Sequence, residues 1–252
     1  MIIGINGRIG VGKDLTGKII QYLTANEEVK RLTTLEEWLE SDDLNGRDYH
    51  WKIKKFAGKL KTIASLLTGI PVEDFEDQEF KKTLLGEEWG TIRPNPLNAI
   101  PVFEDIQFNE LMSVRELLQK LGTEAMRDAL HENVWVNALF ADYKITRLSM
   151  SNSVEEISKQ PYPNWIITDM RFPNEMEAVV ERKGITIRVV RPCSECGGIG
   201  YHKMSCSKQY QKEHPSETSL DDAEFKYTVI NDGSIDDLIE KVRQILITEK
   251  II

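Results

Sequence analysis

The amino-acid sequence predicts an α/β fold built on a parallel central sheet. Short apolar segments alternate along the chain with longer segments whose apolar residues recur at helical spacing. The segment ITIRVV at 185–190 is an almost unbroken apolar run, which is typical of a parallel strand buried on both faces. Alternating strands and helices imply right-handed βαβ units. We expect one α/β domain over residues 1–252, with inserted loops.

Local signals place the individual elements in chain order. Ser113 and Glu116 match a helix capping box, and Pro173 suits the first turn of a helix. We expect strands at 1–5, 51–57, 165–168, 185–190 and 227–230, and helices at 13–22, 59–67, 72–85, from 113 onward, 134–148, 173–183 and 235–247. Three polar or Pro- and Gly-rich segments are expected to be surface excursions, loops or linkers, namely 26–49, 86–101 and 149–163.

A glycine-rich loop, GRIGVGK at 7–13, joins the first expected strand to the first expected helix. The spacing Gly-x-x-x-x-Gly-Lys between a strand and a helix is that of a phosphate-binding P-loop. Glycines let backbone N–H groups turn toward a phosphate, and the helix N-terminus adds positive potential. Lys13 is expected to reach the β- and γ-phosphates of a nucleotide. The alternative is a glycine turn that only connects a strand to a helix.

Asp14 follows the lysine, where this motif usually carries a Ser or Thr hydroxyl that binds magnesium. A carboxylate that faces a phosphate without a cation between them repels it. We therefore expect Asp14 to coordinate metal or water, or to accept a hydrogen bond from the side of a second substrate.

Asp169 and Arg171 directly follow the expected strand at 165–168. In an open parallel sheet, ligands bind beyond the carboxyl ends of the strands, so both residues are expected at the same edge as the glycine loop. A carboxylate in that place commonly orders magnesium, and a guanidinium can hold a phosphate through two hydrogen bonds. The alternative is a surface ion pair worth ~0–1 kcal/mol.

Three cysteines, Cys193, Cys196 and Cys206, lie close together in a glycine-containing segment with His202. A secreted disulfide framework would be even-numbered and spread along the chain. Three thiolates and one imidazole suit a closed, tetrahedral zinc site instead. His214 is an alternative fourth ligand, and three reduced thiols without metal are the alternative interpretation.

Composition and charge restrict the class of protein further. The net charge of −9 argues against stable binding to nucleic acid. No apolar run approaches the ~18 residues of a membrane span, and the first residues lack the charged-then-apolar pattern of a signal peptide. We expect a cytoplasmic enzyme that binds small molecules and no membrane.

Three segments, together with the GKD of the glycine loop, resemble phage-type deoxynucleoside monophosphate kinases. They are LLQKLGTEAMRDALHENVWV at 117–136, IITDMRFPNEMEAV at 166–179 and HPSETSL at 214–220. The resemblance implies a three-layer P-loop kinase fold with a parallel central sheet, helical insertions at about 57–148 that bind the acceptor, and a lid-like loop at about 191–216. It also implies transfer of the γ-phosphoryl group of ATP to a deoxynucleoside monophosphate, with Mg²⁺.

The resemblance assigns roles residue by residue. Its ATP-binding positions are Gly10, Gly12, Lys13, Asp14, Leu15 and Thr16. Its acceptor positions are Arg8, Leu60, Lys61, Trp135, Asp169, Arg171 and Glu175, and we add Arg127 as a second arginine for aligning the acceptor. Lys13, Arg8, Asp169 and Arg171 are the expected catalytic residues. The family favours Thr directly after the Asp, whereas this chain has Leu15 first and Thr16 next, so the loop backbone is expected to hold the phosphates.

Other functions remain open from the sequence. A P-loop ATPase or GTPase switch is one, although the Asn-Lys-x-Asp guanine motif is absent. A P-loop kinase for another small acceptor, such as dephospho-coenzyme A, is the nearest alternative. A zinc-stabilised nucleic-acid module conflicts with the negative net charge. Which bases are accepted, and whether the protein is a homodimer, is left open.

Overall fold

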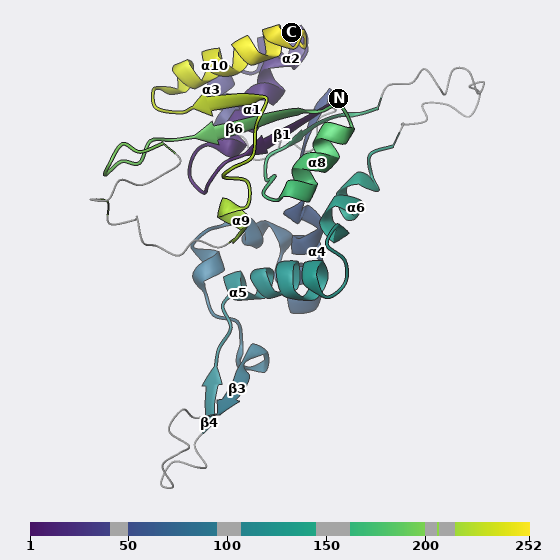
Figure 1. Cartoon of the computed structure of the whole chain (residues 1–252), viewed down its shortest axis with the longest axis vertical. Coiled ribbons are helices and arrows are strands. Elements are labelled where there is room, and N and C mark those ends of the chain that lie inside the picture. Colours follow the sequence, from purple (N-terminus) through teal and green to yellow (C-terminus); the bar gives the residue numbers. More distant parts are fainter. Residues whose placement is uncertain (41–49, 95–106, 145–161, 200–205, 207–214) are drawn as a thin grey trace, which may run out of the picture. The chain divides into compact units, whose positions relative to one another are not determined.

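The computed structural model describes residues 1–40, 50–94, 107–144, 162–199, 206 and 215–252 (Figure 1). These residues belong to two units, one made of residues 1–56 and 136–252 and the other of residues 57–135. The first unit contains the parallel sheet and the glycine loop. The second unit lies within the range 57–148 that the resemblance assigns to the acceptor.

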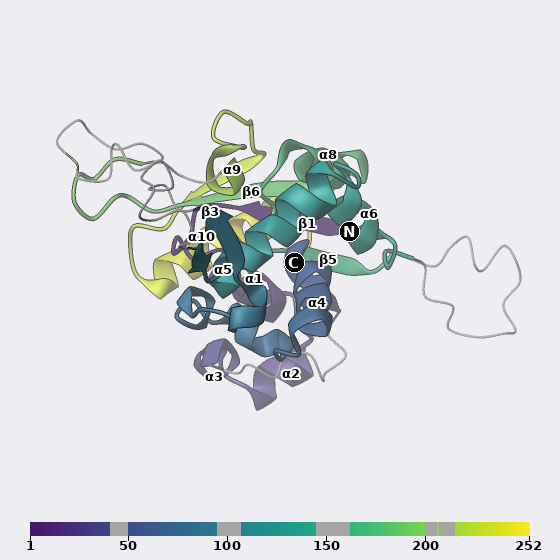
Figure 2. The same ribbon diagram turned by 90° about the horizontal axis from the view of Figure 1, so that it is seen from below.

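Within the described residues, the central sheet contains five parallel strands in the order β2-β5-β1-β6-β7, of which Figure 2 labels β5, β1 and β6. Ile3 of the central strand lies beside Ile166 on one side and Ile185 on the other. Parallel strands place their carboxyl ends at one edge, so the segments that follow them gather there. The strands are β1 (Ile2–Asn6), β2 (Trp51–Lys54), β5 (Asn164–Ile167), β6 (Ile185–Val190) and β7 (Tyr227–Ile230).

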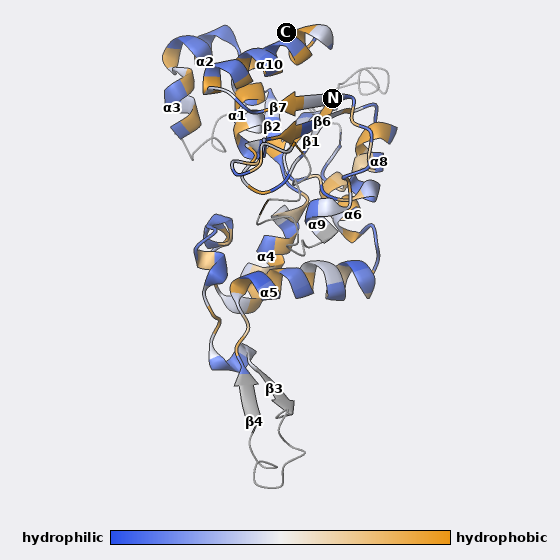
Figure 3. Ribbon diagram, turned by 60° about the vertical axis from the view of Figure 1, so that its left-hand side comes forward, coloured by the Kyte–Doolittle hydropathy of each residue, from blue (hydrophilic) through white to orange (hydrophobic). Residues whose placement is uncertain are grey.

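Helices cover both faces of this sheet because successive side chains of a strand point to opposite faces. Ile3 and Ile5 belong to a buried core with residues of helices α1 (Lys13–Leu23) and α10 (Ile235–Thr248). On the other face, a Cβ on Gly4 would lie 3.0 Å from the sulfur of Met170 and 3.2 Å from Val179 of α8 (Pro173–Glu181). Figure 3 shows the apolar character of β1 and β6 and the mixed character of α10.

Shorter helices complete the first unit. They are α2 (Glu27–Leu32), α3 (Leu35–Glu40), α9 (Pro215–Thr218) and α6 (Val134–Phe140), whose first two residues belong to the second unit. No helix in the described part of the chain has the length and apolar character that crossing a membrane requires.

The second unit packs around its own small core. Its elements are α4 (Ala57–Thr68), the 3₁₀ turns η1 (Val72–Glu76), η2 (Phe80–Lys82) and η3 (Glu87–Trp89), the antiparallel strands β3 (Thr91–Pro94) and β4 (Gln107–Glu110), α5 (Val114–Gln119) and the π-helix η5 (Lys120–Asp128). Its buried apolar residues are Ala64, Phe75, Leu85, Val114 and Leu117.

The α/β class and the five parallel strands confirm the sequence-based prediction, as does the capping box. The hydroxyl of Ser113 accepts a hydrogen bond from the Glu116 N–H at 3.2 Å, and Glu116 accepts one from the Ser113 N–H at 2.9 Å. The helix expected at 134–148 is present as α6 but ends earlier, at Phe140; residues 141–144 are not helical, and residues 145–148 lie outside the described residues.

The prediction of a single helix at 72–85 was wrong. Asp77 interrupts it, since its carboxylate accepts hydrogen bonds from the N–H groups of Glu79 at 2.7 Å and Phe80 at 3.4 Å. A side chain that binds nearby backbone N–H groups offers them an alternative to helical hydrogen bonds. Two separate 3₁₀ turns result.

Two expected loops also contain regular structure. The segment 86–101 includes the strand β3. Its partner strand β4 comes after this Pro- and Gly-rich segment in the sequence, so the segment itself showed no pairing signal. The charged segment 26–49 includes α2 and α3, and Trp38 of α3 is 1% exposed. Leu35 and Leu39 of the same helix also pack against the core of the sheet unit, so apolar burial holds this charged segment in place.

Candidate active site

The glycine loop leaves β1 at the central position of the sheet and ends at the first residue of α1. At Gly7, a Cβ would lie 2.4 Å from the carbonyl oxygen of Val189, so only glycine permits the close approach to β6. Gly10 and Gly12 have φ angles of 80° and 100°, which side-chain-bearing residues rarely adopt. The loop therefore turns its backbone where the sequence predicted a phosphate site.

Asn231 fixes this loop from the end of β7. Its side-chain amide donates a hydrogen bond of 2.8 Å to the carbonyl of Val11, and the residue is 4% exposed. Sequence reasoning missed this residue. The only available signal was its position, a polar residue directly after the last strand, at the edge where the other ligand-binding segments were expected.

The side chain of Lys13 folds back over the glycine loop. Its Nζ donates a hydrogen bond of 2.8 Å to the carbonyl of Arg8, and the residue is 8% exposed. Burial, followed by repulsion from Arg171, lowers the pKa of Lys13 to about 8, against partial compensation by Asp14 and Asp169. The charged form of such a buried ammonium group is stabilised strongly when a polyanion binds beside it.

Asp14 has an exposed carboxylate that is held in position by two neighbours. Its Oδ1 accepts a hydrogen bond of 2.8 Å from the hydroxyl of Thr168 and lies 3.4 Å from Nζ of Lys55. Partial desolvation would raise the pKa of Asp14, but Lys55 and Thr168 lower it below its usual value. The carboxylate is ionised at neutral pH and open to solvent.

The two residues after Asp14 face inward. The hydroxyl of Thr16 donates to the carbonyl of Gly12 at 2.8 Å within α1, and Thr16 is fully buried. Leu15 packs against the apolar core of the sheet unit. These two side chains are therefore engaged within the protein, and phosphate binding by the loop backbone stays a prediction.

The turn after β5 is built by hydrogen bonds to its backbone. Oδ1 of Asp169 accepts from the N–H of Phe56 at 2.7 Å, which ties this turn to the end of β2. Glu175, 2% exposed, accepts from the N–H groups of Arg171 at 2.7 Å and Phe172 at 3.1 Å. Glu175 thus positions the backbone that carries Arg171, and its contact with an acceptor stays a prediction.

Two acidic residues of the segment at α9 pair with the arginines of this edge. The guanidinium of Arg171 forms an ion pair with Glu217, whose second oxygen accepts a hydrogen bond of 3.0 Å from the Ile9 N–H of the glycine loop. Asp221 lies 2.9 Å from both Arg8 and Arg188. Sequence reasoning assigned no role to Glu217 or Asp221, because only the folded chain brings them to the loop.

These ion pairs close the space above the loop. The hollow that remains has a volume of about 30 Å³ and is lined by Gly7, Arg8, Arg188 and Arg191 together with Glu217 and Asp221. Sites for small molecules usually enclose ~300–1,000 Å³. A nucleotide phosphate that reaches these arginines must therefore displace the carboxylates.

The second unit holds four of the predicted acceptor residues. A Cβ on Gly122 of η5 would lie 3.0 Å from Leu60, and the Trp135 indole N–H donates to the Gly122 carbonyl at 2.8 Å. Lys61 forms an ion pair with Glu76. Leu60 and Trp135 are thus brought together as packing partners of one π-helix, a feature that is frequent at functional sites. Arg127, also on η5, is partly exposed.

The three cysteines also converge, with all three sulfur atoms within 4.8 Å of one another. His202 and His214, the candidate fourth ligands, lie outside the described residues.

A parallel sheet with a glycine loop after its central strand, and a lysine and arginines at the same edge, is the arrangement of P-loop proteins. The comparison with known families identifies it further. The family model for deoxynucleotide monophosphate kinase matches residues 11–242, and the chain belongs to this family. The comparisons favour neither a dephospho-coenzyme A kinase nor a nucleotide-hydrolysing switch.

Three phage proteins are similar to this chain. The deoxynucleotide monophosphate kinase of Enterobacteria phage T4 is 25% identical over 170 residues, 60% of this chain and 60% of the T4 protein. The deoxynucleoside-5'-monophosphate kinase of Escherichia phage T5 is 20% identical over 269 residues, 92% of this chain and 89% of the T5 protein. The deoxynucleotide monophosphate kinase of Escherichia phage RB69 is 28% identical over 138 residues, 55% of this chain and 46% of the RB69 protein. The matched part is thus less than two thirds of the T4 and RB69 proteins.

Proposed function

We propose that the protein transfers the γ-phosphoryl group of ATP to the phosphate of a deoxynucleoside monophosphate, which gives the deoxynucleoside diphosphate and ADP. The observation that carries this proposal is the placement of the glycine loop, Lys13 and Arg171 at one edge of the sheet, in a chain of the deoxynucleotide monophosphate kinase family. Both substrates are small anions of the cytoplasm, where we expect the enzyme to act.

On the ATP side, the loop backbone supplies N–H groups and Lys13 supplies charge. Transfer needs an oxygen of the acceptor phosphate in line with the γ-phosphorus, so that one P–O bond forms while the bond to the β-phosphate oxygen breaks. The Nζ of Lys13 stabilises the charge that moves to the leaving ADP. No strong general base is required, since the acceptor phosphate is already anionic near neutral pH.

Magnesium fits the carboxylates at this edge. Asp14 is ionised, exposed and held by Thr168 and Lys55, and carboxylate oxygens are ligands that Mg²⁺ prefers. Asp14 and Asp169 are the residues that would hold the ion, directly or through water. When bound, magnesium would supply positive charge that offsets the negative charge of the nucleotide phosphates. A cation between Asp14 and the phosphates would also remove the repulsion between the carboxylate and the bound nucleotide.

On the acceptor side, we assign Arg171 and Arg8 to the phosphate group. A guanidinium binds a phosphate through two parallel hydrogen bonds, and both arginines already bind carboxylates, which have similar geometry. Arg127 of η5 is the further arginine for aligning the acceptor. Leu60, Lys61 and Trp135 are assigned to the acceptor through the family resemblance, and Glu175 through the backbone of Arg171.

The direct test is a coupled assay of ADP formation with ATP and a panel of deoxyribo- and ribonucleoside monophosphates. We expect turnover with deoxynucleoside monophosphates and a much lower rate with dephospho-coenzyme A or without acceptor. Arg171→Ala should raise the acceptor KM more than the ATP KM, while the exposed Arg243→Ala on α10 serves as the matched control. Turnover of ATP that does not depend on any acceptor would contradict the kinase assignment.

A further inference from the structure

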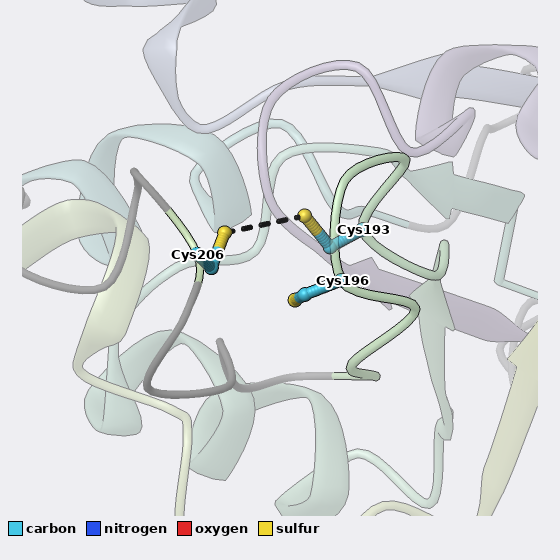
Figure 4. A group of neighbouring side chains, drawn as sticks. All are labelled: Cys193, Cys196 and Cys206. Carbon is cyan, nitrogen blue, oxygen red and sulfur yellow. Dashed lines mark hydrogen bonds between the residues drawn. The ribbon is translucent and has the colours of Figure 1, made fainter.

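A cluster of three thiols lies outside the phosphate-binding machinery. Cys193 and Cys196 follow β6, and Cys206 comes from a separate stretch of the same connection (Figure 4). In Figure 4 the side chain of Cys206 points toward the turn that carries the other two. Cys193 and Cys196 are partly buried, and Cys206 is 4% exposed. The proposed transfer reaction uses none of these residues.

The turn from Cys193 to Gly198 has a closed backbone. The Gly197 N–H donates to the Cys193 carbonyl at 2.7 Å, and the Cys193 N–H donates to the Gly198 carbonyl at 2.9 Å. Gly197 has a φ of 66°, although a Cβ there would meet nothing within 4 Å, so glycine is required for conformation and not for space. This turn holds the thiols of Cys193 and Cys196 close to each other.

The spacing of the sulfur atoms suits a tetrahedral metal. The sulfur atoms of Cys193 and Cys206 are 3.8 Å apart, and all three lie within 4.8 Å of one another. Zinc binds thiolates at about 2.3 Å, and tetrahedral angles then separate two thiolates by about 3.8 Å. A disulfide needs a sulfur–sulfur bond of about 2.05 Å and would leave the third thiol without a role.

We propose that Cys193, Cys196 and Cys206 bind one structural zinc ion as thiolates. Loading replaces three S–H bonds with three Zn–S bonds, releases the thiol protons to solvent and moves no electrons. The metal would join the turn after β6 to the stretch that leads to α9, which carries Glu217. Its role would be to fix Cys206 to the turn at Cys193 and Cys196, because a crosslink between separate stretches of a chain stabilises the folded arrangement.

The first test is the metal content of the full-length protein, purified from zinc-supplemented cells with a tag that contains no histidine and without chelator. We expect about one zinc ion per chain and no thiol that reacts rapidly with a thiol reagent. X-ray absorption at the zinc edge should show three sulfur neighbours at about 2.3 Å, and cobalt substitution should give the intense visible absorption of tetrahedral cobalt–thiolate sites.

Cys193→Ser, Cys196→Ser and Cys206→Ser should each lower the zinc content, whereas the exposed Ser194→Ala in the same turn should leave it unchanged. The wild-type measurement decides the question even if a variant fails to fold. Below about 0.2 zinc per chain with three freely titrating thiols, the proposal is wrong. A Cys193–Cys206 disulfide, bound iron with acid-labile sulfide, or fewer than three sulfur neighbours would also overturn it.

Discussion

The backbone N–H of Ile9 in the glycine loop donates a hydrogen bond of 3.0 Å to Oε2 of Glu217. The other oxygen of the same carboxylate pairs with the guanidinium of Arg171. Backbone N–H groups of such a loop and a nearby arginine are the groups that bind phosphate oxygens. Glu217 therefore places an anion of the protein itself where the proposed function requires a substrate phosphate.

We predict that Glu217→Gln strengthens ATP binding about 3–10-fold, because the amide keeps the shape of the side chain but removes the negative charge beside the Ile9 N–H of the glycine loop. The ion pair is largely shielded from solvent, with side-chain exposures of 29% for Arg171 and 13% for Glu217, so its charge matters more than that of a surface pair. Isothermal titration of the variant with ATP measures the effect.

The matched control is Glu177→Gln, the same change on the exposed side of α8. It should leave the affinity for ATP unchanged, which separates local competition from a general change in net charge. Equal affinities for wild type and Glu217→Gln, or weaker binding by the variant, would show that Glu217 does not compete with phosphate.

The phosphate loop and the sheet were predictable because their signals are local. Glycine spacing, a lysine in register and apolar strands are all properties of short segments. Asn231 and Glu217 were not predictable in the same way, since each is defined by a contact with the loop that lies more than 200 residues away in sequence. The number of polar residues that could make such contacts is large, and only the fold selects among them.

The error at 72–85 arose because a side chain competed with the helix for backbone hydrogen bonds. The segment 72–85 has apolar residues at helical spacing, but Asp77 binds two backbone N–H groups and ends the helix. Glu175 illustrates a different limit of sequence reasoning, which assigned it to the acceptor. Its buried contacts with the backbone of Arg171 and Phe172 indicate a positioning role that sequence spacing alone could not distinguish from a substrate contact.

Lys13→Ala should reduce kcat by ~10²–10³-fold, about 3–4 kcal/mol, because a preorganised charge is lost beside the transferred group. The fold should survive, since the change removes a buried ammonium group that donates a hydrogen bond to the Arg8 carbonyl within the same loop. Steady-state kinetics and circular dichroism test both parts. The exposed Lys52→Ala on β2 is the control, and turnover of Lys13→Ala near the wild-type rate would exclude the phosphate-loop assignment.

The pH dependence of the reaction should show the lowered pKa of Lys13. The pKa of about 8 means that the free enzyme loses the positive charge as the pH rises through that value. Because kcat/KM reports the free enzyme, kcat/KM for ATP should fall above pH 8. Bound polyphosphate stabilises the ammonium form of Lys13 and so raises its pKa. We therefore expect kcat to stay constant up to a higher pH than kcat/KM does. A constant kcat/KM for ATP up to pH 9.5 would contradict this account.

Asp14→Asn should raise the Mg²⁺ concentration required for half-maximal activity about 10–100-fold. The amide oxygen can still accept the hydrogen bond from Thr168, so the side chain stays in place while its charge is removed. Magnesium titrations at fixed ATP measure the shift, with the exposed Asp236→Asn of α10 as the control. An unchanged magnesium requirement would remove Asp14 from the metal site.

Gly10 and Gly12 of the loop both have positive φ angles but should respond differently to alanine. Gly10→Ala introduces only the backbone penalty of about 1–2 kcal/mol, because a Cβ there meets no atom within 4 Å. Gly12→Ala adds a clash, since its Cβ would lie 2.8 Å from the side-chain nitrogen of Asn231. Asn231 must then move and lose its buried hydrogen bond to Val11, which costs about 1–3 kcal/mol more. Urea unfolding should rank the free energies of unfolding as wild type, Gly10→Ala and Gly12→Ala, from highest to lowest.

A double-mutant cycle tests whether Asn231 causes that difference. Asn231→Ala alone should destabilise the protein, because the Val11 carbonyl loses its partner. In the Gly12→Ala/Asn231→Ala double variant, the clash is absent, so the loss of stability should be smaller than the sum of the two single losses. The corresponding cycle with Gly10→Ala should be additive. If the Gly12 cycle is additive as well, the cost of Gly12→Ala comes from its φ of 100° alone and Asn231 does not clamp the loop.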